Sequence, residues 1–400
     1  MKVLQLCHKP PCPPVDGGCL AMYNLSRGLL DNGVDLRIMT IHTHKHDFRE
    51  NEIPEEFLKS TNIDSVFVDT KLNFIDAFSN LITDDSYNIS RFFSPDFDIR
   101  LSRILKKEKF DIIHLESLFM TPYLGTIRRH SKAKVVLRSH NLEHIIWERM
   151  AVSSRNRIKR AYIKHLAKQL KKYEQNTLNE VNGIAAITKH DANMYRKYGF
   201  EGALMNLPFG LFLEEYQYAN PGEHFPGIFH LGSMDWKPNE EGIQWFLENV
   251  WPKVLKAIPK AQFNLAGRNM PEWLLETELD GVQLDGEVPS ARGYMSQFNI
   301  MVVPLLSAGG MRVKIIEGMA LGKAIVSTRI GAEGVDGEHG RHLMIADKAD
   351  EMAAHLIELA NDAQKTQELG KNARQLIEER YDHKVLGGHL ISFYKSLTEA

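Results

Sequence analysis

The residues best suited to chemistry lie in one segment, from Pro304 to Gly322. A strand pattern ends at Pro304, a glycine-containing loop follows, and a helical pattern begins with Arg312 and Lys314 near its start. The dipole at a helix start disfavours cations, so two cations there require an anion, which the free N–H groups also attract. A diphosphate fits, because arginine offers a planar pair of donors and lysine a point charge. The alternative is an ordinary surface helix with solvated charges.

Glu317 and the Gly17-Gly18 pair extend this picture towards a nucleotide site. Glu317 follows Arg312 by five residues, and its carboxylate can accept hydrogen bonds from ribose hydroxyls. Gly17 and Gly18 follow the first strand and open a helix, where backbone N–H groups favour an anion. A proline-rich turn that merely joins strand and helix is the alternative. The loop has neither a G-x-G-x-x-G pattern nor a Walker lysine, which argues against dinucleotide and ATPase sites.

A second group of polar residues lies where strands of the first half end. His140 follows the strand pattern at 135–138, and a neutral imidazole can donate a hydrogen bond to a sugar hydroxyl or accept one from it. Asn141 and Glu143 stand beside it, and Glu116 ends another strand. We expect these residues at the sheet edge that binds ligands. A structural histidine and a glutamate buried at its strand end are the alternatives.

A metal site is not expected in this chain. His42, His44 and His46 alternate and would share one face of a strand. No carboxylate or cysteine near them completes a set of ligands, so a solvated loop is the preferred interpretation.

Strand and helix patterns alternate along the chain, which predicts parallel sheets with right-handed crossovers. In the first half, strands are expected at 3–6, 34–38, 110–115, 134–138 and 183–188, and helices near 20–30 and 155–180. In the second half, strands are expected at 228–232, 262–266, 282–285, 300–304 and 324–327, and helices at 242–256 and 315–321. Proline and glycine accumulate at 206–227, which indicates a linker. The predicted fold class is therefore α/β, with two doubly wound domains.

The composition is that of an ordinary globular protein and excludes several classes. Of 400 residues, 43% are hydrophobic and 25% charged, so disordered and low-complexity chains are excluded. The longest apolar runs are too short to span a bilayer, and the apolar start is too short for a signal peptide. Three cysteines without Cys-x-x-Cys spacing indicate a reducing compartment. The net charge of −2 divides into +5 for residues 1–215 and −7 for residues 216–400, without overall attraction to nucleic acid.

The segment from Gly310 to Thr328, followed by G-A-E-G at 331–334, resembles a motif of the GT-B glycosyltransferases of family 4. In one subgroup of these retaining, nucleotide-sugar-dependent enzymes the motif reads G-x-R-x-K-x-x-E-a-M-A-x-G-K-x-V-V-S-T…G-A-E-G. Residues 14–18, 139–143 and 232–239 resemble further segments of the same enzymes. The resemblance covers nearly the whole chain and is specific for fold and reaction class.

The resemblance implies a GT-B fold, in which two Rossmann-like doubly wound domains face a central cleft. Residues 1–212 would bind the acceptor, with a C-terminal helix at 380–400 crossing back onto them, and residues 216–378 would bind the nucleotide sugar. The enzyme would transfer a sugar, with retention, to a glycan or lipid-linked acceptor in surface polysaccharide biosynthesis. No metal or other cofactor would be needed. A nucleotide-sugar 2-epimerase-like enzyme and a catalytically silent sugar-binding or scaffold protein are the alternatives.

The resemblance also implies roles for individual residues. His140, Arg312 and Lys314 form the catalytic set, with His140 on the transferred sugar and the two cations on the diphosphate. The donor-binding residues are Gly17, Gly18, Ser233, Gly286, Val288, Gly309, Gly310 and Glu317. The acceptor-binding residues are Asp16, Glu116, Asn141 and Glu143. The family usually carries a glutamate where this chain has Gly309, so backbone N–H groups at 309–310 are expected to replace that carboxylate.

The predicted helix at 155–173 combines an apolar stripe with many basic residues. The stripe is formed by Ile158, Tyr162, Leu166, Leu170 and Tyr173. The basic residues around it are Arg155, Arg157, Lys159, Arg160, Lys164, Lys168, Lys171 and Lys172. Such a helix can lie on an anionic membrane, which would make the protein cytoplasmic and peripheral on the inner membrane face. The alternative is a core-facing helix with a solvated basic face.

Overall fold

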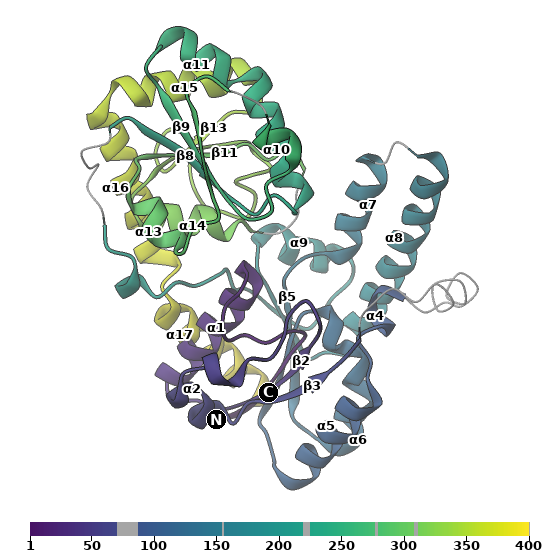
Figure 1. Ribbon diagram of the computed structural model, residues 1–400. Coiled ribbons are helices and arrows are strands. Elements are labelled where there is room, and N and C mark those ends of the chain that lie inside the picture. Colours follow the sequence, from purple (N-terminus) through teal and green to yellow (C-terminus); the bar gives the residue numbers. More distant parts are fainter. Residues whose placement is uncertain (70–86, 154–155, 219–224, 277–278, 308–310, 400) are drawn as a thin grey trace. The chain divides into compact units, whose positions relative to one another are not determined.

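The computed structural model describes residues 1–69, 87–153, 156–218, 225–276, 279–307 and 311–399. The chain divides into two compact units (Figure 1). Unit 1 contains residues 1–210 and 383–400, and unit 2 contains residues 211–382. No helix within the described residues is both long and apolar enough to cross a membrane.

Unit 1 is built on a parallel sheet, which has seven strands within the described residues, in the order β3-β2-β1-β4-β5-β6-β7. The strands are β1 (Lys2–Cys7), β2 (Asp35–His42), β3 (Asp64–Phe67), β4 (Ile112–Glu116), β5 (Lys134–Ser139), β6 (Gly183–Ala186) and β7 (Ala203–Asn206). β4 is buried along its whole length, as expected for a central strand of a sheet covered on both faces.

Helices cover both faces of this sheet. They are α1 (Gly17–Asp31), α2 (Glu55–Thr61), α4 (Tyr87–Ser90), α5 (Pro95–Lys107), α6 (Leu124–His130), α7 (Glu143–Ser153), α8 (Arg157–Leu178), α9 (Lys189–Lys197) and α17 (His383–Thr398). Alternate side chains of β1 enter two separate cores: Val3 packs with residues of α1 and α17, and Leu4 with residues of α5 and α8.

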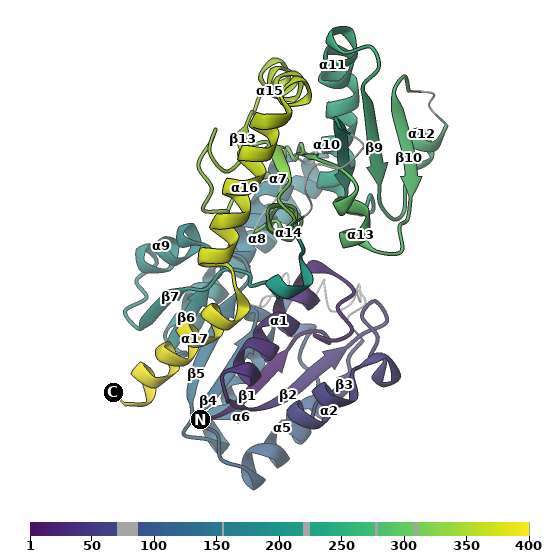
Figure 2. The ribbon, with the colours of Figure 1, turned by 90° about the vertical axis from the view of Figure 1, so that its left-hand side faces the viewer.

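The C-terminal helix α17 lies beside α1 in unit 1 (Figure 2). Glycines make this close packing possible, because a Cβ on Gly28 would lie 2.7 Å from the carbonyl oxygen of His383. The hydroxyl of Tyr394 lies 2.6 Å from Nδ1 of His114 and joins α17 to β4 by a buried hydrogen bond. The last helix is thus an integral part of unit 1.

Unit 2 is built on a second parallel sheet, of six strands within the described residues, in the order β10-β9-β8-β11-β12-β13. The strands are β8 (Gly227–Leu231), β9 (Gln262–Ala266), β10 (Val282–Gly286), β11 (Ile300–Val303), β12 (Ala324–Ser327) and β13 (Met344–Ile345). The helices are α10 (Lys237–Asn249), α11 (Trp251–Ala257), α12 (Glu272–Leu275), α13 (Ala291–Ser296), α14 (Val313–Ala320), α15 (Ala349–Asn361) and α16 (Ala363–Arg380).

The predicted fold class is confirmed: both units are doubly wound parallel α/β sheets. The expected helix at 242–256 is two helices, α10 and α11, because Val250 at their junction leaves the regular helix before Pro252. Residues 45–100, for which the sequence pattern predicts no helix or strand, contain α2, β3, α4 and the start of α5 among their described residues.

Each sheet has one place where the strand order reverses. In unit 1 it lies between β1 and β4, and in unit 2 between β8 and β11. The connections that follow such a pair of strands run to opposite faces and leave a crevice at the carboxyl ends, where doubly wound folds bind ligands. A ligand site is therefore expected at the residues that follow β1, β4, β8 and β11.

Candidate functional site

In unit 2 the loop after β11 leads into α14 and places two cations at its start. Arg312 is the N-cap residue of α14, and Lys314 lies in its first turn. Arg312 is buried, and its guanidinium lies 5.5 Å from the ring centre of Trp236, which follows β8. Ile315 and Ile316, which follow Lys314 in α14, are buried.

Lys314 is held by neutral partners. Its Nζ donates to Oδ1 of Asn239 over 2.9 Å and lies 3.5 Å from Nε2 of His230. Nδ1 of His230 lies 2.7 Å from the carbonyl oxygen of Val302, so Nδ1 carries the proton and Nε2 presents a lone pair to the ammonium. Burial holds the pKa of His230 well below its usual value, which keeps the ring neutral.

The ammonium of Lys314 is electrostatically unsatisfied. Burial, with a smaller contribution from the charge of Arg312, lowers the pKa of Lys314 to about 7. Among the described residues, no carboxylate forms an ion pair with Lys314. A half-buried ammonium without a carboxylate could be stabilised by an anion from outside the chain.

The loop after β8 keeps the space beside Lys314 open. A Cβ on Gly232 would lie 2.6 Å from Nζ of Lys314 and 2.7 Å from Nδ2 of Asn239. The Asn239 amide also donates to the carbonyl oxygen of Ser233 over 2.8 Å, which fixes the loop to the start of α10. The hydroxyl of Ser233 donates to the carboxylate of Asp235. Only glycine fits at position 232 without displacing the lysine.

Glu317 lies one turn further along α14 and has a tyrosine partner. The hydroxyl of Tyr216 donates to Oε1 of Glu317 over 2.7 Å. The guanidinium of Arg292 lies 4.5 Å from the ring centre of Tyr216 and donates to Oε2 of Glu215 over 2.7 Å. Burial raises the pKa of Glu317, and the bond from Tyr216 opposes that rise.

The end of β10 and the segment after it border a cavity of about 730 Å³. Asp285 and Val288 line it, together with Tyr294, whose hydroxyl donates to Oδ2 of Asp285 over 2.6 Å. Gly286 has a φ of 66°, which favours glycine there. Arg312 and Lys314 are not among the residues that line this cavity. Gly309 and Gly310 lie outside the described residues.

In unit 1, Glu116 at the end of β4 is the centre of a buried polar network. Its carboxylate lies 2.7 Å from Nε2 of His140 and 3.3 Å from Nη1 of Arg138, and it accepts a hydrogen bond from the Gln5 amide over 2.9 Å. Its backbone carbonyl lies 2.9 Å from Nδ1 of His8. The charge of Arg138 and the hydrogen bonds outweigh burial and hold the pKa of Glu116 well below its usual range. The glutamate expected to contact an acceptor is thus fully buried beneath His140.

Glu143 is also buried, at the start of α7. Its backbone N–H donates to Oε1 of Glu174, and burial together with the Glu174 charge raises its pKa to about 8. His144 lies 2.5 Å from the other oxygen of Glu174 and 2.9 Å from the hydroxyl of Tyr198. This cluster joins α7 and α8 to Tyr198 at the end of α9. Asn141, between it and His140, is half-buried.

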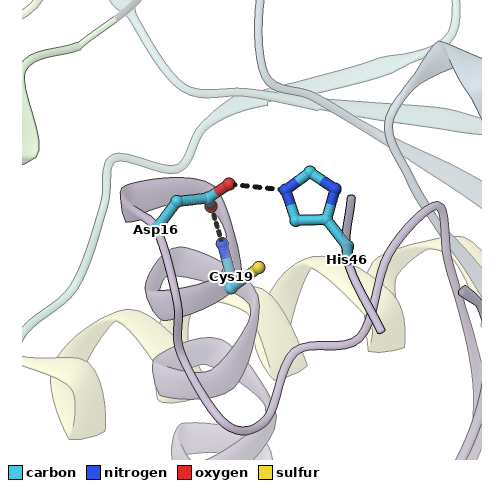
Figure 3. A group of neighbouring side chains, drawn as sticks. All are labelled: Asp16, Cys19 and His46. Carbon is cyan, nitrogen blue, oxygen red and sulfur yellow. Dashed lines mark hydrogen bonds and ion pairs between the residues drawn. The ribbon is translucent and has the colours of Figure 1, made fainter. Parts of the chain in front are cut away.

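Asp16 caps α1 and is bound by a cation. Its Oδ1 accepts from the backbone N–H of Cys19 over 2.8 Å, and Nζ of Lys9 lies 2.8 Å from both carboxylate oxygens. His46 lies 3.0 Å from Oδ2 and forms a compact group with Asp16 and Cys19 (Figure 3). The expectation that no carboxylate or cysteine lies near His46 was wrong, because the β2 loop folds back over α1. Gly17 and Gly18 form the first turn of α1.

Several residues at these sites were not found from the sequence: His8, His230, Asn239 and Tyr216. His8, His230 and Tyr216 stand in no local motif, and Asn239 ends the segment 232–239 without a role assigned to it from the sequence. Only the fold brings these residues to the catalytic candidates. His8 and His230 did offer one signal, since each stands at the end of a strand beside the point where the strand order reverses.

Comparison with known families decides the class. Residues 15–205 match the family described as Glycosyltransferase Family 4, and residues 225–362 match the family described as Glycosyl transferases group 1. The chain is a family 4, group 1 glycosyltransferase. This glycosyltransferase is 22% identical, over 96% of its length and 97% of the relative's, to an uncharacterized 44.6 kDa protein in the cps region of Klebsiella pneumoniae.

Solved structures show the same fold. Sucrose-phosphate synthase of Thermosynechococcus elongatus is 16% identical, with a TM-score of 0.72 over 99% of both chains. HepE of Anabaena, solved with UDP, is 13% identical, with a TM-score of 0.66 over 99% of this glycosyltransferase and 100% of HepE. The predicted GT-B fold, with two parallel Rossmann-like sheets, is confirmed.

The lowered pKa of Lys314 makes a prediction about stability. Because the unfolded chain binds this proton more tightly than the folded chain, burial of the ammonium opposes folding at pH 7 and below. That cost disappears as the pH rises from about 7 towards the ordinary lysine value of 10.5. We expect Lys314→Met to be more stable than the wild type at pH 7, by on the order of 2 kcal/mol, with the difference shrinking by pH 10. Urea unfolding followed by circular dichroism at several pH values measures it, and a difference independent of pH contradicts the burial argument.

Proposed function

We propose that this glycosyltransferase takes its sugar from a nucleotide-sugar donor and transfers it with retention at the anomeric carbon. The observation that carries the proposal is the ammonium of Lys314 beside Arg312, half-buried, among neutral partners and at the point where the strand order of unit 2 reverses. Fixed cations at this place lower the barrier to departure of a diphosphate, because negative charge grows on the leaving group during transfer.

The surrounding residues supply the other contacts of such a donor. Glu317 accepts hydrogen bonds from the ribose, held in place by the Tyr216 hydroxyl. Backbone groups at Gly286 and Val288 contact the base, and the loop at Ser233 lies on the phosphate side, beside Lys314. Gly309 and Gly310, outside the described residues, would offer backbone N–H groups in place of the missing glutamate. In this proposal residues 216–378 form the donor-binding domain.

Unit 1 is the proposed acceptor side. His140 contacts the transferred sugar, and Gly17 and Gly18, in the first turn of α1, border the site with their backbone N–H groups. Asp16, Asn141, Glu143 and Glu116 shape its floor, the glutamates from buried positions. Residues 1–212 and the C-terminal helix then form the acceptor-binding domain.

Two relatives support the substrate class. HepE has been solved with UDP and with UDP-glucose, which favours a nucleotide-sugar donor for this chain. The Klebsiella pneumoniae relative lies in the cps region, which favours a role in polysaccharide biosynthesis and a glycan or lipid-linked acceptor.

Removal of Arg312 tests the proposal. We expect Arg312→Ala to lower turnover of the nucleotide sugar at least about 100-fold, the usual cost of losing one group that stabilises the developing charge. Lys237→Ala removes an exposed cation from the same unit and should retain activity. Proton NMR of donor and acceptor mixtures follows both the product and its anomeric configuration. Full turnover by Arg312→Ala would contradict the role of Arg312 at the diphosphate. A product of inverted anomeric configuration would contradict the retaining mechanism. An epimerised donor formed without acceptor would instead assign the 2-epimerase reaction.

We also propose that the pair α7 and α8 lies on an anionic membrane. The stripe predicted on α8 is divided: Leu166 and Leu170 are buried in unit 1, whereas Ile158 is 84% exposed. Val152, near the end of α7, is 76% exposed, so both helices carry an exposed apolar side chain near their junction. The two helices lie side by side (Figure 1). Exposed basic residues follow on α8, among them Lys164, Lys168 and Lys172, an arrangement that suits anionic lipid. Arg155 lies outside the described residues.

Liposome flotation tests the membrane surface. The wild type should float with vesicles of phosphatidylglycerol and phosphatidylcholine and remain behind with phosphatidylcholine alone, since each basic residue contributes about 1 kcal/mol at an anionic surface. Changing Lys164, Lys168, Lys171 and Lys172 to Glu should abolish flotation. The matched control changes Arg103, Lys106, Lys107 and Lys109, exposed around α5, and should float normally. Absence of wild-type binding ends this proposal and leaves the basic face as a solvated surface.

A further inference from the structure

We propose that Glu116 fixes His8 and His140 as a pair of hydrogen-bond acceptors that bind sugar hydroxyls, which makes His8 a second sugar-binding residue of this enzyme. The inference rests on the proposed glycosyl transfer. It adds His8 to the sugar-binding residues and states that both histidines accept hydrogen bonds from the sugar. It follows from three residues that end or follow neighbouring strands: His8 after β1, Glu116 on β4 and His140 after β5.

The tautomer of His8 is set by the backbone of Glu116. Nδ1 of His8 lies 2.9 Å from the carbonyl oxygen of Glu116. A carbonyl oxygen has no proton to give, so Nδ1 must donate, and Nε2 of the neutral ring carries a lone pair. Burial lowers the pKa of His8 to about 3, with smaller contributions from Lys9 and His140, so the ring stays neutral at physiological pH.

The tautomer of His140 is set by the side chain of the same glutamate. Nε2 of His140 lies 2.7 Å from Oε2 of Glu116. Arg138 and the other partners keep this carboxylate ionised, as the lowered pKa of Glu116 indicates, so Nε2 of His140 donates and Nδ1 carries the lone pair. Burial is the largest influence on the pKa of His140 and lowers it, which favours the neutral ring.

The two rings form one surface. Their centres are 5.6 Å apart with an interplanar angle of 83°, and Phe119 packs on His8 at 5.7 Å. Both histidines are half-buried, so they retain contact with solvent. Within the described residues, no hydrogen bond is formed to Nε2 of His8 or to Nδ1 of His140. Two fixed acceptors therefore stand open at the carboxyl edge of the unit 1 sheet.

Because both open ring nitrogens are hydrogen-bond acceptors, they favour a ligand that carries hydrogen-bond donors. A sugar hydroxyl has a proton to donate to an imidazole lone pair, whereas a phosphate dianion or a carboxylate has none. The nearby cation Lys9 is bound to both oxygens of Asp16 and does not supply positive charge for an anion. The pair is thus suited to hydroxyls, either of the donor sugar or of the acceptor glycan, and not to the diphosphate.

The first test observes the tautomers in the protein without substrate. In the wild type, ¹⁵N NMR of the histidine rings at pH 7.5 should show protonated Nδ1 and unprotonated Nε2 for His8, and the reverse for His140. Assignment uses His8→Gln and His140→Gln. A protonated Nε2 on His8, or an imidazolium on either residue, overturns the inference whatever the enzymatic activity.

The second test separates the two nitrogens of His8 by function. In His8→Asn the shorter amide reaches the Glu116 carbonyl but leaves nothing at the position of Nε2, whereas in His8→Gln the side-chain oxygen reaches that position. We expect His8→Asn to lower kcat/KM about tenfold, as for loss of one hydrogen bond, and His8→Gln to recover most of it. Affinity for the nucleoside diphosphate without its sugar should be unchanged in both variants.

The separate KM values distinguish the source of the hydroxyl. A rise confined to the nucleotide sugar places the pair on the donor, and a rise confined to the acceptor places it on the acceptor glycan. Equal activity of His8→Asn and the wild type overturns the role of His8 while leaving glycosyl transfer intact. A wild type that binds no nucleotide and transfers no sugar contradicts the proposed function itself, and the tautomer measurement still decides the geometry.

Discussion

The site of unit 2 depends on one interaction, the contact between the ammonium of Lys314 and two neutral side chains. His230 can only accept, because its Nδ1 is committed to the Val302 carbonyl, and Asn239 accepts through its amide oxygen. These partners fix the position of the charge without neutralising it. The strand order explains why they meet, since His230 belongs to β8 and Lys314 follows β11, its neighbour in the sheet. The free-energy cost of burying this ammonium is offset if an anion binds beside it.

Unit 1 uses the same topology for the opposite chemistry. Its centre is Glu116, whose carboxylate charge is balanced by Arg138. The backbone carbonyl of Glu116 orients the His8 ring, and its carboxylate orients the His140 ring. The ring nitrogens left open are acceptors, which suit hydroxyls. In the proposed function the two doubly wound sheets have different tasks: unit 2 would bind a diphosphate through fixed positive charge, and unit 1 would recognise sugar through neutral groups. The −7 balance of residues 216–400 is no obstacle, because the charges that matter are local.

Much of the fold could be predicted from the sequence because buried parallel strands are short continuous apolar runs. Strands such as β11 and β12 stand out, and their order follows from alternation with helices. Arg312, Lys314 and Glu317 could be proposed as site residues from the sequence because they share one local segment. His8, Tyr216 and Asn239 were not, since their partners Glu116, Glu317 and Lys314 lie 108, 101 and 75 residues away in the sequence. The contact of His46 with Asp16 was missed for the same reason.

The measurement that tests the central claim most directly is proton uptake when a nucleoside diphosphate binds. With a pKa of about 7, Lys314 is largely deprotonated at pH 8, whereas a bound diphosphate requires the ammonium. Calorimetric titration with UDP, GDP, ADP and TDP at pH 8, in two buffers of different ionisation enthalpy, gives the number of protons taken up. At least one nucleotide should bind with uptake of nearly one proton, and Lys314→Arg should bind it without uptake. Binding without proton uptake by the wild type, or no binding of any of the four, would contradict the account.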